Sequence, residues 1–438
     1  MTTISAIISA IGNNSSVYPL LVRDCGIEVP TKVFLTYQQN KDDEEVAKLA
    51  TRERFLDEYA TSAVWLGGIP LLDKISNYII KKKGFNPLIN PKMFNEEKFQ
   101  GLQYNIEKFK AKAPDAIKDL EKLTDINTQK YYKKLLAGKF LASTIIPIAF
   151  MGFILPKMIF ASSARRIEKL RQKRAAQNKT MLEPVMRPNF KAPKKGIWED
   201  FSLTSNKPVA FTGLSLAKLA TVSTQDKMMI TDGGYTVGRV VTARKKNEAL
   251  DVGFRLSGMM FLNFVAPKWI EKALNKISGL DLDPIMLADK NFTSKVKSGG
   301  IVLPADDKPE TLLKFVDANP DSMFVKLANQ FKKVTMQDNN IRDPRAYVDF
   351  EALGKFRNSI ANFIEKAPKN KNFEKYLLKS KILRSVNILL NVGISSFLLA
   401  YALPKATFAF RKLVTGSDLE PGLAPDVQNA EKATPKKV

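Results

Sequence analysis

The sequence predicts a mainly α-helical membrane protein built from two tandem homologous halves. Two long uncharged segments predict the membrane, and a set of landmarks that recurs in the same order along the 438 residues predicts the duplication. Each half is expected to hold a short β element, one weak and one strong membrane segment, and an amphipathic helical loop between them.

The strong membrane segments lie at 140–156 and 385–404. The second contains twenty successive residues without a charge, and the first contains seventeen, with an apolar continuation beyond it. About 20 apolar residues cross about 30 Å of hydrocarbon as a helix. Both segments therefore predict membrane-spanning helices, and the alternative is a set of proline-kinked core helices in a water-soluble protein.

Two weaker segments, 60–72 and 256–267, hold thirteen and twelve uncharged residues. Runs of about 10–14 residues are more typical of interfacial segments or of helices buried in a soluble core. The sequence leaves open whether they cross the bilayer or only enter it. If both cross, the halves are parallel repeats related by a pseudo-twofold axis along the membrane normal.

A proline, followed directly or a few residues later by a lysine, closes each of the four segments. The prolines are Pro70, Pro156, Pro267 and Pro404, and the lysines are Lys74, Lys157, Lys268 and Lys405. Proline lacks an N–H and clashes with the preceding turn, so the four prolines are predicted helix kinks. A lysine there can lay its stem along acyl chains and place its ammonium among phosphates, so these lysines are predicted to mark the lipid-headgroup boundary.

The recurring landmarks indicate an internal duplication. "DCGIEVPTKV" from Asp24 resembles "DGGYTVGRV" from Asp232, and both are expected to form the short β element because Val, Thr and Tyr favour strands. These two stretches, and three later pairs of landmarks, lie about 200 residues apart, whereas Pro156 and Pro404 lie about 250 apart. The second copy is therefore expected to carry an insertion.

The predicted organisation has five parts. They are an N-terminal amphipathic segment at 1–16, a first membrane repeat at 17–164, a basic inter-repeat linker at 165–224, a second membrane repeat at 225–415 with an insertion around 322–383, and a disordered tail at 416–438. The amphipathic loop of the first half is predicted from apolar residues at helical spacing between 95 and 110.

The formal net charge of +25 predicts a polyanionic partner. Basic residues are densest just after the first strong segment, where six of them form a basic cluster: Arg165, Arg166, Lys169, Arg171, Lys173 and Arg174. Such a cluster attracts anionic membrane lipids at about 1 kcal/mol per cation. The positive-inside rule places the linker and both termini in the cytoplasm, and we expect the plasma (inner) membrane. Nucleic acid is the competing partner, but no recognition motif supports it.

No histidine is present, and Cys25 is the single cysteine. This excludes Ser-His-Asp and Cys-His catalysis and the common zinc sites. The glycines of "TDGGYTVG" lack the spacing of a phosphate-binding loop. The sequence therefore predicts no catalytic residue, no metal and no cofactor. Asp24 and Asp232 precede glycines and are interpreted as turn residues, with a functional carboxylate pair as the alternative.

The leading functional hypothesis is a non-enzymatic integral membrane protein that acts as a lipid-contacting scaffold or assembly component. Its expected partners are membrane lipids, a second copy of the chain or another membrane protein. The alternative is a transporter or lipid-translocating protein with a path between two pseudo-symmetric halves. The duplication favours this alternative, and the lack of charge inside the strong segments speaks against it. A membrane-bound enzyme using carboxylate or lysine chemistry is the third hypothesis.

Overall fold

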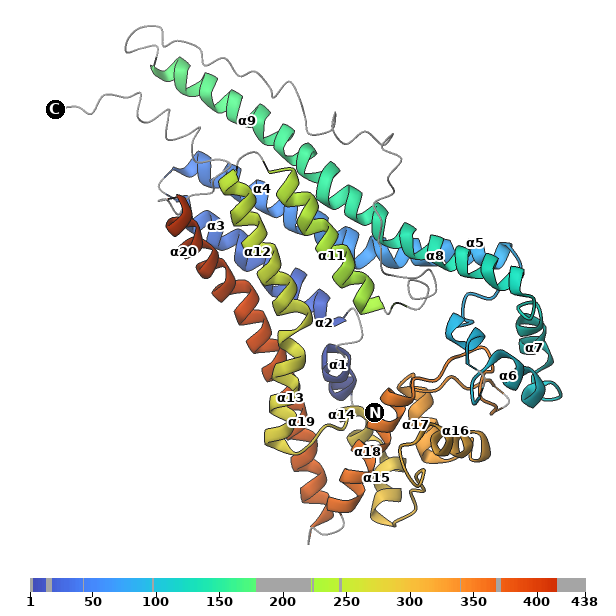
Figure 1. Ribbon diagram of the computed structural model, residues 1–438. Helices are drawn as coiled ribbons and strands as arrows, with labels where there is room; N and C mark the ends of the chain where they lie inside the picture. The colour runs from blue at the N-terminus through green and yellow to red at the C-terminus, as the bar shows by residue number, and fades with distance from the viewer. Residues whose placement is uncertain are drawn as a thin grey trace.

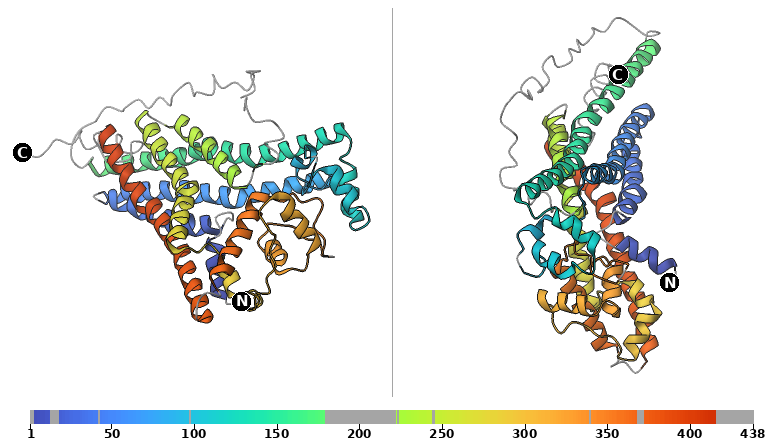
Figure 2. Two further views of the ribbon diagram at one scale, coloured as in Figure 1. Left: turned by 60° about the horizontal axis from the view of Figure 1, so that its bottom comes forward. Right: turned by 90° about the vertical axis from the view of Figure 1, so that its right-hand side faces the viewer.

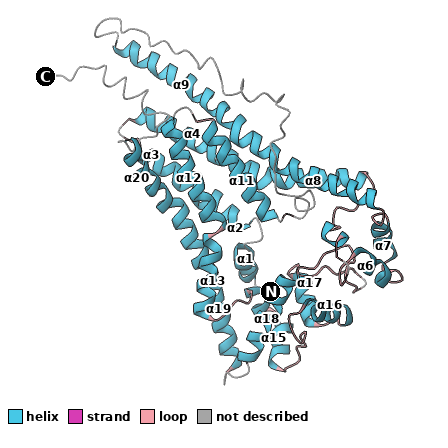
Figure 3. Ribbon diagram, viewed as in Figure 1, coloured by secondary structure: helices cyan, strands magenta, loops and turns pink. Residues whose placement is uncertain are grey.

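The structure, a computed structural model, describes residues 3–12, 18–41, 43–96, 98–178, 222, 224–243, 246–338, 340–367 and 372–415. These residues are mainly helical, as predicted (Figure 3). The predicted β elements are wrong, because their residues form the helices α3 (Val29–Gln39) and α11 (Thr224–Val241). Packing against neighbouring helices here outweighs the weak strand preference of valine and threonine.

The first half contains a short N-terminal part, two long interrupted helices and a small lobe between them. The N-terminal part is α1 (Thr3–Gly12), α2 (Tyr18–Leu21), the π-helical turn η1 (Val22–Glu28) and α3. The first long helix is α4 (Glu44–Ala63), η2 (Val64–Gly68) and α5 (Ile69–Lys82). The first lobe is η3 (Pro91–Phe94), α6 (Leu102–Phe109) and α7 (Pro114–Glu121). The second long helix is α8 (Ile126–Ala149), η4 (Phe150–Ile154) and α9 (Leu155–Asn178).

The second half begins with α11 and again has two long helices around a lobe. The first long helix is α12 (Lys246–Phe264) and α13 (Ala266–Ser278). The second lobe is α14 (Pro284–Ala288), α15 (Lys290–Lys297), α16 (Pro309–Ala318), α17 (Met323–Gln330) and α18 (Phe350–Lys366). The second long helix is α19 (Phe373–Phe397), η5 (Leu398–Ala402) and α20 (Leu403–Thr415).

The long helices form one bundle, and the two lobes lie side by side near one end of it (Figures 1 and 2). The far ends of α9 and α20 reach the opposite end of the bundle, at the upper left of Figure 1. The helix α1 packs on α14 and α19, and the Ser9 hydroxyl donates to the Asp283 carboxylate at 2.6 Å. The predicted tail at 416–438 and most of the linker fall outside the described residues.

Three helical stretches are long and apolar enough to cross a membrane: Ile126–Leu170, Lys246–Ser278 and Phe373–Val414. They contain both strong segments and the weak segment 256–267, and they indicate a membrane protein. The weak segment 60–72 spans the junction of α4 and α5 but is not among the three. Large apolar side chains on these stretches are exposed, including Ile146, Leu389 and Phe397, as expected of helix faces in contact with lipid.

The predicted helix kinks coincide with interruptions of the helices. Pro70, Pro156 and Pro404 are each the second residue after a π-helical turn, and Pro267 is the second residue after a break at Val265. The widened turn fits the prolines, because each lacks the N–H that a regular α-helical turn would use.

A residue of the second half stabilises the helix interruption before Pro156. The carbonyl oxygen of Gly152, four residues before this proline, accepts a hydrogen bond of 3.2 Å from the Thr242 hydroxyl. A freed carbonyl inside a membrane bundle needs such a partner because water cannot supply one. The second half thus provides the hydrogen-bond donor that the Gly152 carbonyl lacks within its own helix.

Two glycines bring the halves into backbone contact beside this hydrogen bond. Gly152 of η4 faces Gly238 of α11, and a Cβ placed on Gly238 would lie 2.8 Å from the Cα of Gly152. Small residues allow membrane helices to approach this closely and gain dispersion energy. Any side chain at position 238 must therefore push α11 away from η4.

We predict that Gly238→Ala lowers the free energy of unfolding in detergent by about 1–3 kcal/mol, as overpacking does. Gly138→Ala in α8 is the matched control, because a Cβ at Gly138 meets nothing within 4 Å. The control should leave stability unchanged or raise it by up to about 1 kcal/mol. Thermal and denaturant unfolding followed by circular dichroism measures both; equal stability of the two variants contradicts the close approach.

The lobes are fastened to each other by a segment at 340–349, which lies within the predicted insertion and is named here the clasp. Arg342 of the clasp is buried and donates to Asp317 at 3.0 Å and to Asn105 at 3.1 Å. The Gln100 side chain makes hydrogen bonds of 2.9 and 2.6 Å with the backbone carbonyl and N–H of Val348. Both halves therefore contribute to one joined pair of lobes.

Candidate functional site

A cluster of buried charges lies where α4 of the first half meets α11 and α12 of the second. Its centre is Glu58, whose Oε1 lies 3.0 Å from Nη1 of Arg255 and 3.3 Å from Nη1 of Arg54. The Nζ of Lys32 lies 3.5 Å from the other carboxylate oxygen of Glu58 and also pairs with Glu28. Three cations thus surround one carboxylate, and all of these side chains are largely buried.

Two further ion pairs join the halves on either side of this centre. Asp57 accepts from Nη2 of Arg239 at 2.9 Å, with both side chains less than a tenth exposed. Asp73 pairs with Lys227 at 3.0 Å, which connects α5 to the beginning of α11. Taking charges out of water costs several kcal/mol per ion, and only close pairing offsets it. The contact between the halves therefore depends on charge matching.

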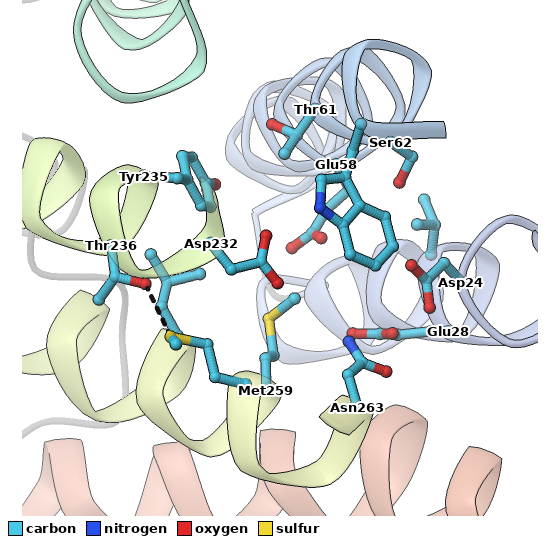
Figure 4. A pocket seen from close by; sticks show the side chains of 14 residues that line it. Asp24, Glu28, Glu58, Thr61, Ser62, Asp232, Tyr235, Thr236, Met259 and Asn263 are labelled. Carbon is cyan, nitrogen blue, oxygen red and sulfur yellow. Dashed lines mark hydrogen bonds between the residues drawn. The ribbon is translucent and has the colours of Figure 1, made fainter. Parts of the chain in front are cut away.

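A cavity of about 40 Å³ lies beside the cluster (Figure 4). Both halves contribute to its wall: η1 provides Asp24 and Glu28, and α11 provides Asp232. The remaining wall residues are Val29, Glu58, Thr61, Ser62, Trp65, Tyr235, Thr236, Leu256, Met259, Met260 and Asn263. A volume of this size holds about one or two water-sized molecules. Four of the wall residues carry carboxylates.

Several polar atoms on this wall have no hydrogen-bond partner. They are Oδ1 of Asp24, both carboxylate oxygens of Glu28, Oγ1 of Thr61, Nε1 of Trp65 and Oδ1 of Asn263. Glu28 is nevertheless ion-paired with Lys32. A buried polar atom without a partner costs about 1–3 kcal/mol, so a concentration of them at one cavity indicates a place built to receive something polar.

Asp24 and Asp232 are not the turn residues that the sequence suggested, because both lie inside helical elements, η1 and α11. The alternative interpretation as a carboxylate pair is closer to the structure, since both line the same cavity. Sequence reasoning missed Glu58 and Arg255. The signal was present: they lie 197 residues apart, the separation of Pro70 and Pro267.

The predicted boundary lysines are not part of this cavity. Lys74, Lys157, Lys268 and Lys405 are all exposed, while Pro156, Pro267 and Pro404 beside them are buried and Pro70 is half-buried. Exposure at the ends of apolar helices is compatible with contact to headgroups. The lysines lie on four different helices and form no common site.

The predicted basic cluster lies along α9. Arg165, Arg166 and Lys169 are exposed there. Arg171, Lys173 and Arg174 belong to the same helix, and their side chains lie outside the described residues. The described part of the cluster lies near the end of the candidate span Ile126–Leu170, and none of its residues lines the cavity.

The described residues contain no group of three or more carboxylate, cysteine or histidine side chains placed to hold a metal ion. The fold and the cavity define a helical membrane protein whose bundle encloses charged side chains. No protein family model, curated protein or solved structure matches this chain, so the geometry alone carries the functional conclusion.

The Asp57–Arg239 pair can be tested by a double-mutant cycle. We predict that Asp57→Leu and Arg239→Leu each lower the free energy of unfolding by about 3–5 kcal/mol, because each leaves one buried charge without its partner. The double variant should be more stable than either single variant. Unfolding in detergent measures all three.

The exposed pair Glu44–Lys48 is the matched control, with side chains 69% and 67% exposed. Removing either member should leave stability unchanged, since an ion pair in water contributes little. Additive losses at Asp57 and Arg239 would contradict the proposed bridge between the halves.

Proposed function

We propose that the chain is an integral membrane transport protein of two tandem homologous halves, with its path between them. The observation that carries this proposal is the acidic cavity lined by helical elements of both halves. Buried ionisable groups are costly in a membrane bundle and mark solute or ion paths. A scaffold has no need for unpaired carboxylates at its centre.

The order of the helices supports the duplication. Each half contains a long interrupted helix, a lobe and a second long interrupted helix in this order. These are preceded by α11 in the second half, and by η1 and α3, after α1 and α2, in the first. Within the halves, α5 packs on α8 as α13 packs on α19, and α4 packs on α9 as α12 packs on α20. The same element therefore has the same neighbour in each half.

The contacts between the halves are also equivalent in the two directions. The helix α11 of the second half packs on α8 and η4 of the first, while η1 and α3 of the first half pack on α19 and η5 of the second. Such reciprocal packing is what a pseudo-twofold relation requires. The cavity lies between these elements, which is where transporters built from repeats bind their substrates.

The interrupted helices supply places where the halves could move relative to each other. The turns η1 and η2 both contribute residues to the cavity wall, Asp24 and Trp65 among them. π-Helical turns inside helices occur frequently at functional sites, and proline prevents them from closing into regular helix. Rocking of one half against the other about these turns would open the cavity alternately to the two sides.

The membrane placement follows from the ends of the bundle. The proposal puts the lobes on one side of the membrane and the basic cluster of α9, with the linker, on the cytoplasmic side, where anionic lipids attract it. The exposed lysines at positions 74, 157, 268 and 405 would lie at headgroup depth. We place the N-terminal helix on the lobe side because α1 packs beside α14, whereas the sequence analysis expected a cytoplasmic N-terminus.

A lipid-contacting scaffold or assembly component is the second candidate, with a second copy or another membrane protein as its partner. The exposed basic residues of α9 favour it, because they need only an anionic surface. This candidate gives the cavity no role, and that difference separates the two by experiment.

Transport can be tested in proteoliposomes loaded with dyes that report Na⁺, K⁺ or H⁺. We predict a cation flux that requires the protein and falls at least tenfold in Thr236→Phe, because the new ring fills the cavity. Ala406→Phe is the matched control, since Ala406 is exposed on α20 and the added ring can point into lipid. Equal flux with both variants, or no flux with the unchanged protein, would reject transport through this cavity.

The topology can be tested with single cysteines in a Cys25→Ser background. Lys110→Cys and Lys326→Cys, exposed on the two lobes, should react with a membrane-impermeant maleimide from one side. Lys169→Cys on α9 should react only from the other side. Labelling of all three from the same side would mean that the helices enter the bilayer without crossing it.

A further inference from the structure

Two of the four carboxylates on the cavity wall differ from the others in their partners. Glu58 has three cations beside it, and Glu28 has Lys32. No ion pair or hydrogen bond within the described part of the chain reaches the carboxylates of Asp24 or Asp232. The neighbouring Arg23 instead donates from Nε to the carbonyl oxygen of Pro19 at 3.3 Å. Among the described residues, Asp24 and Asp232 therefore have no cation at ion-pair distance, and Arg23 and Lys32 interact with Asp24 only at longer range.

Four cations on the elements around the cavity are already paired with carboxylates. Lys32 of α3, Arg54 of α4 and Arg255 of α12 all contact Glu58, while Arg239 of α11 contacts Asp57. Moving Arg239 toward the cavity would leave Asp57 without its partner, and moving Lys32 would remove the ion pair of Glu28. A cation from outside the chain would pair with Asp24 and Asp232 without breaking any of these ion pairs.

The unpartnered atoms point to the same kind of ligand. Oδ1 of Asp24 and Oδ1 of Asn263 are hydrogen-bond acceptors without a donor, and their residues are 7% and 6% exposed. The Thr61 hydroxyl, which can accept as well as donate, and the donor Nε1 of Trp65 are also unpartnered. Carboxylate, amide and hydroxyl oxygens are ligands that hard metal cations prefer.

We infer that this cavity binds one monovalent metal cation, such as Na⁺ or K⁺, between Asp24 and Asp232, with the oxygens of Thr61 and Asn263 as neutral ligands. The volume of about 40 Å³ suits a single ion. A divalent ion is disfavoured, because Ca²⁺ takes six to eight oxygens with several carboxylates and no such group of three is assembled in the described residues. The role of this ion as the transported solute rests on the proposed function. Its binding in the cavity does not.

The inference can be tested on the purified full chain in detergent. Thermal unfolding is measured in NaCl, KCl and choline chloride at equal ionic strength and constant pH. A metal cation that binds only the folded state raises the unfolding temperature, by a few degrees at a concentration about a hundredfold above its Kd, and choline does not. Calorimetric titration of the unchanged protein should give one site per chain.

Two variants assign the site. Asp24→Asn and Asp232→Asn each remove one negative charge with little change of shape, and each should abolish the ion-specific shift. Asp115→Asn, in an exposed residue of the first lobe, is the matched control and should retain it. Should one cavity variant fail to fold, the other decides, because the loss of either carboxylate should abolish the ion-specific shift.

The remaining outcomes are also decisive. Equal stabilisation by choline, or an ion-specific shift that survives both cavity substitutions, overturns the assignment. A stability that follows pH without ion preference would make the proton the occupant and would overturn the metal cation. Ion binding without flux in vesicles would support the ion site and reject the transport function. Flux without ion-specific binding would support the transport function and reject the ion site.

Discussion

The buried ion pairs between α4 of the first half and α11 and α12 of the second are the interaction on which the structure depends. Glu58 sits among Lys32, Arg54 and Arg255, and Asp57 faces Arg239. These side chains are tolerable inside a helical bundle only while their partners remain within ion-pair distance. Separation of the halves would expose unpaired charge to an apolar environment. The two halves therefore form one structural unit.

Backbone contacts reinforce this unit at the same interface. The approach of Gly152 to Gly238 and the hydrogen bond from Thr242 to the Gly152 carbonyl both occur beside the interruption at Pro156. Pro156 cannot donate a hydrogen bond to the Gly152 carbonyl in the first half, and the Thr242 hydroxyl of the second half donates one to it. The interruptions are consequently part of the packing between the halves, and not local defects of single helices.

The lobes give a second connection, outside the bundle. Arg342 is fully enclosed between Asp317 and Asn105, one from each half, and Gln100 binds the backbone of Val348 as a neighbouring strand would. The clasp that makes these contacts belongs to the extra residues expected in the second copy. The clasp therefore lies where it can limit how far the two halves of the chain move apart.

The sequence by itself determined the helical class, the apolar segments that can span a membrane and the four prolines that interrupt helices, because these follow from local composition and from the missing N–H of proline. It was wrong on the strands around Val33 and Val240, since strand preference is weaker than helix packing. Only the tertiary structure decided that Asp24, Asp232, Glu58 and Asn263 share one cavity. These residues are more than 200 positions apart at their extremes, and no local pattern records which helices become neighbours.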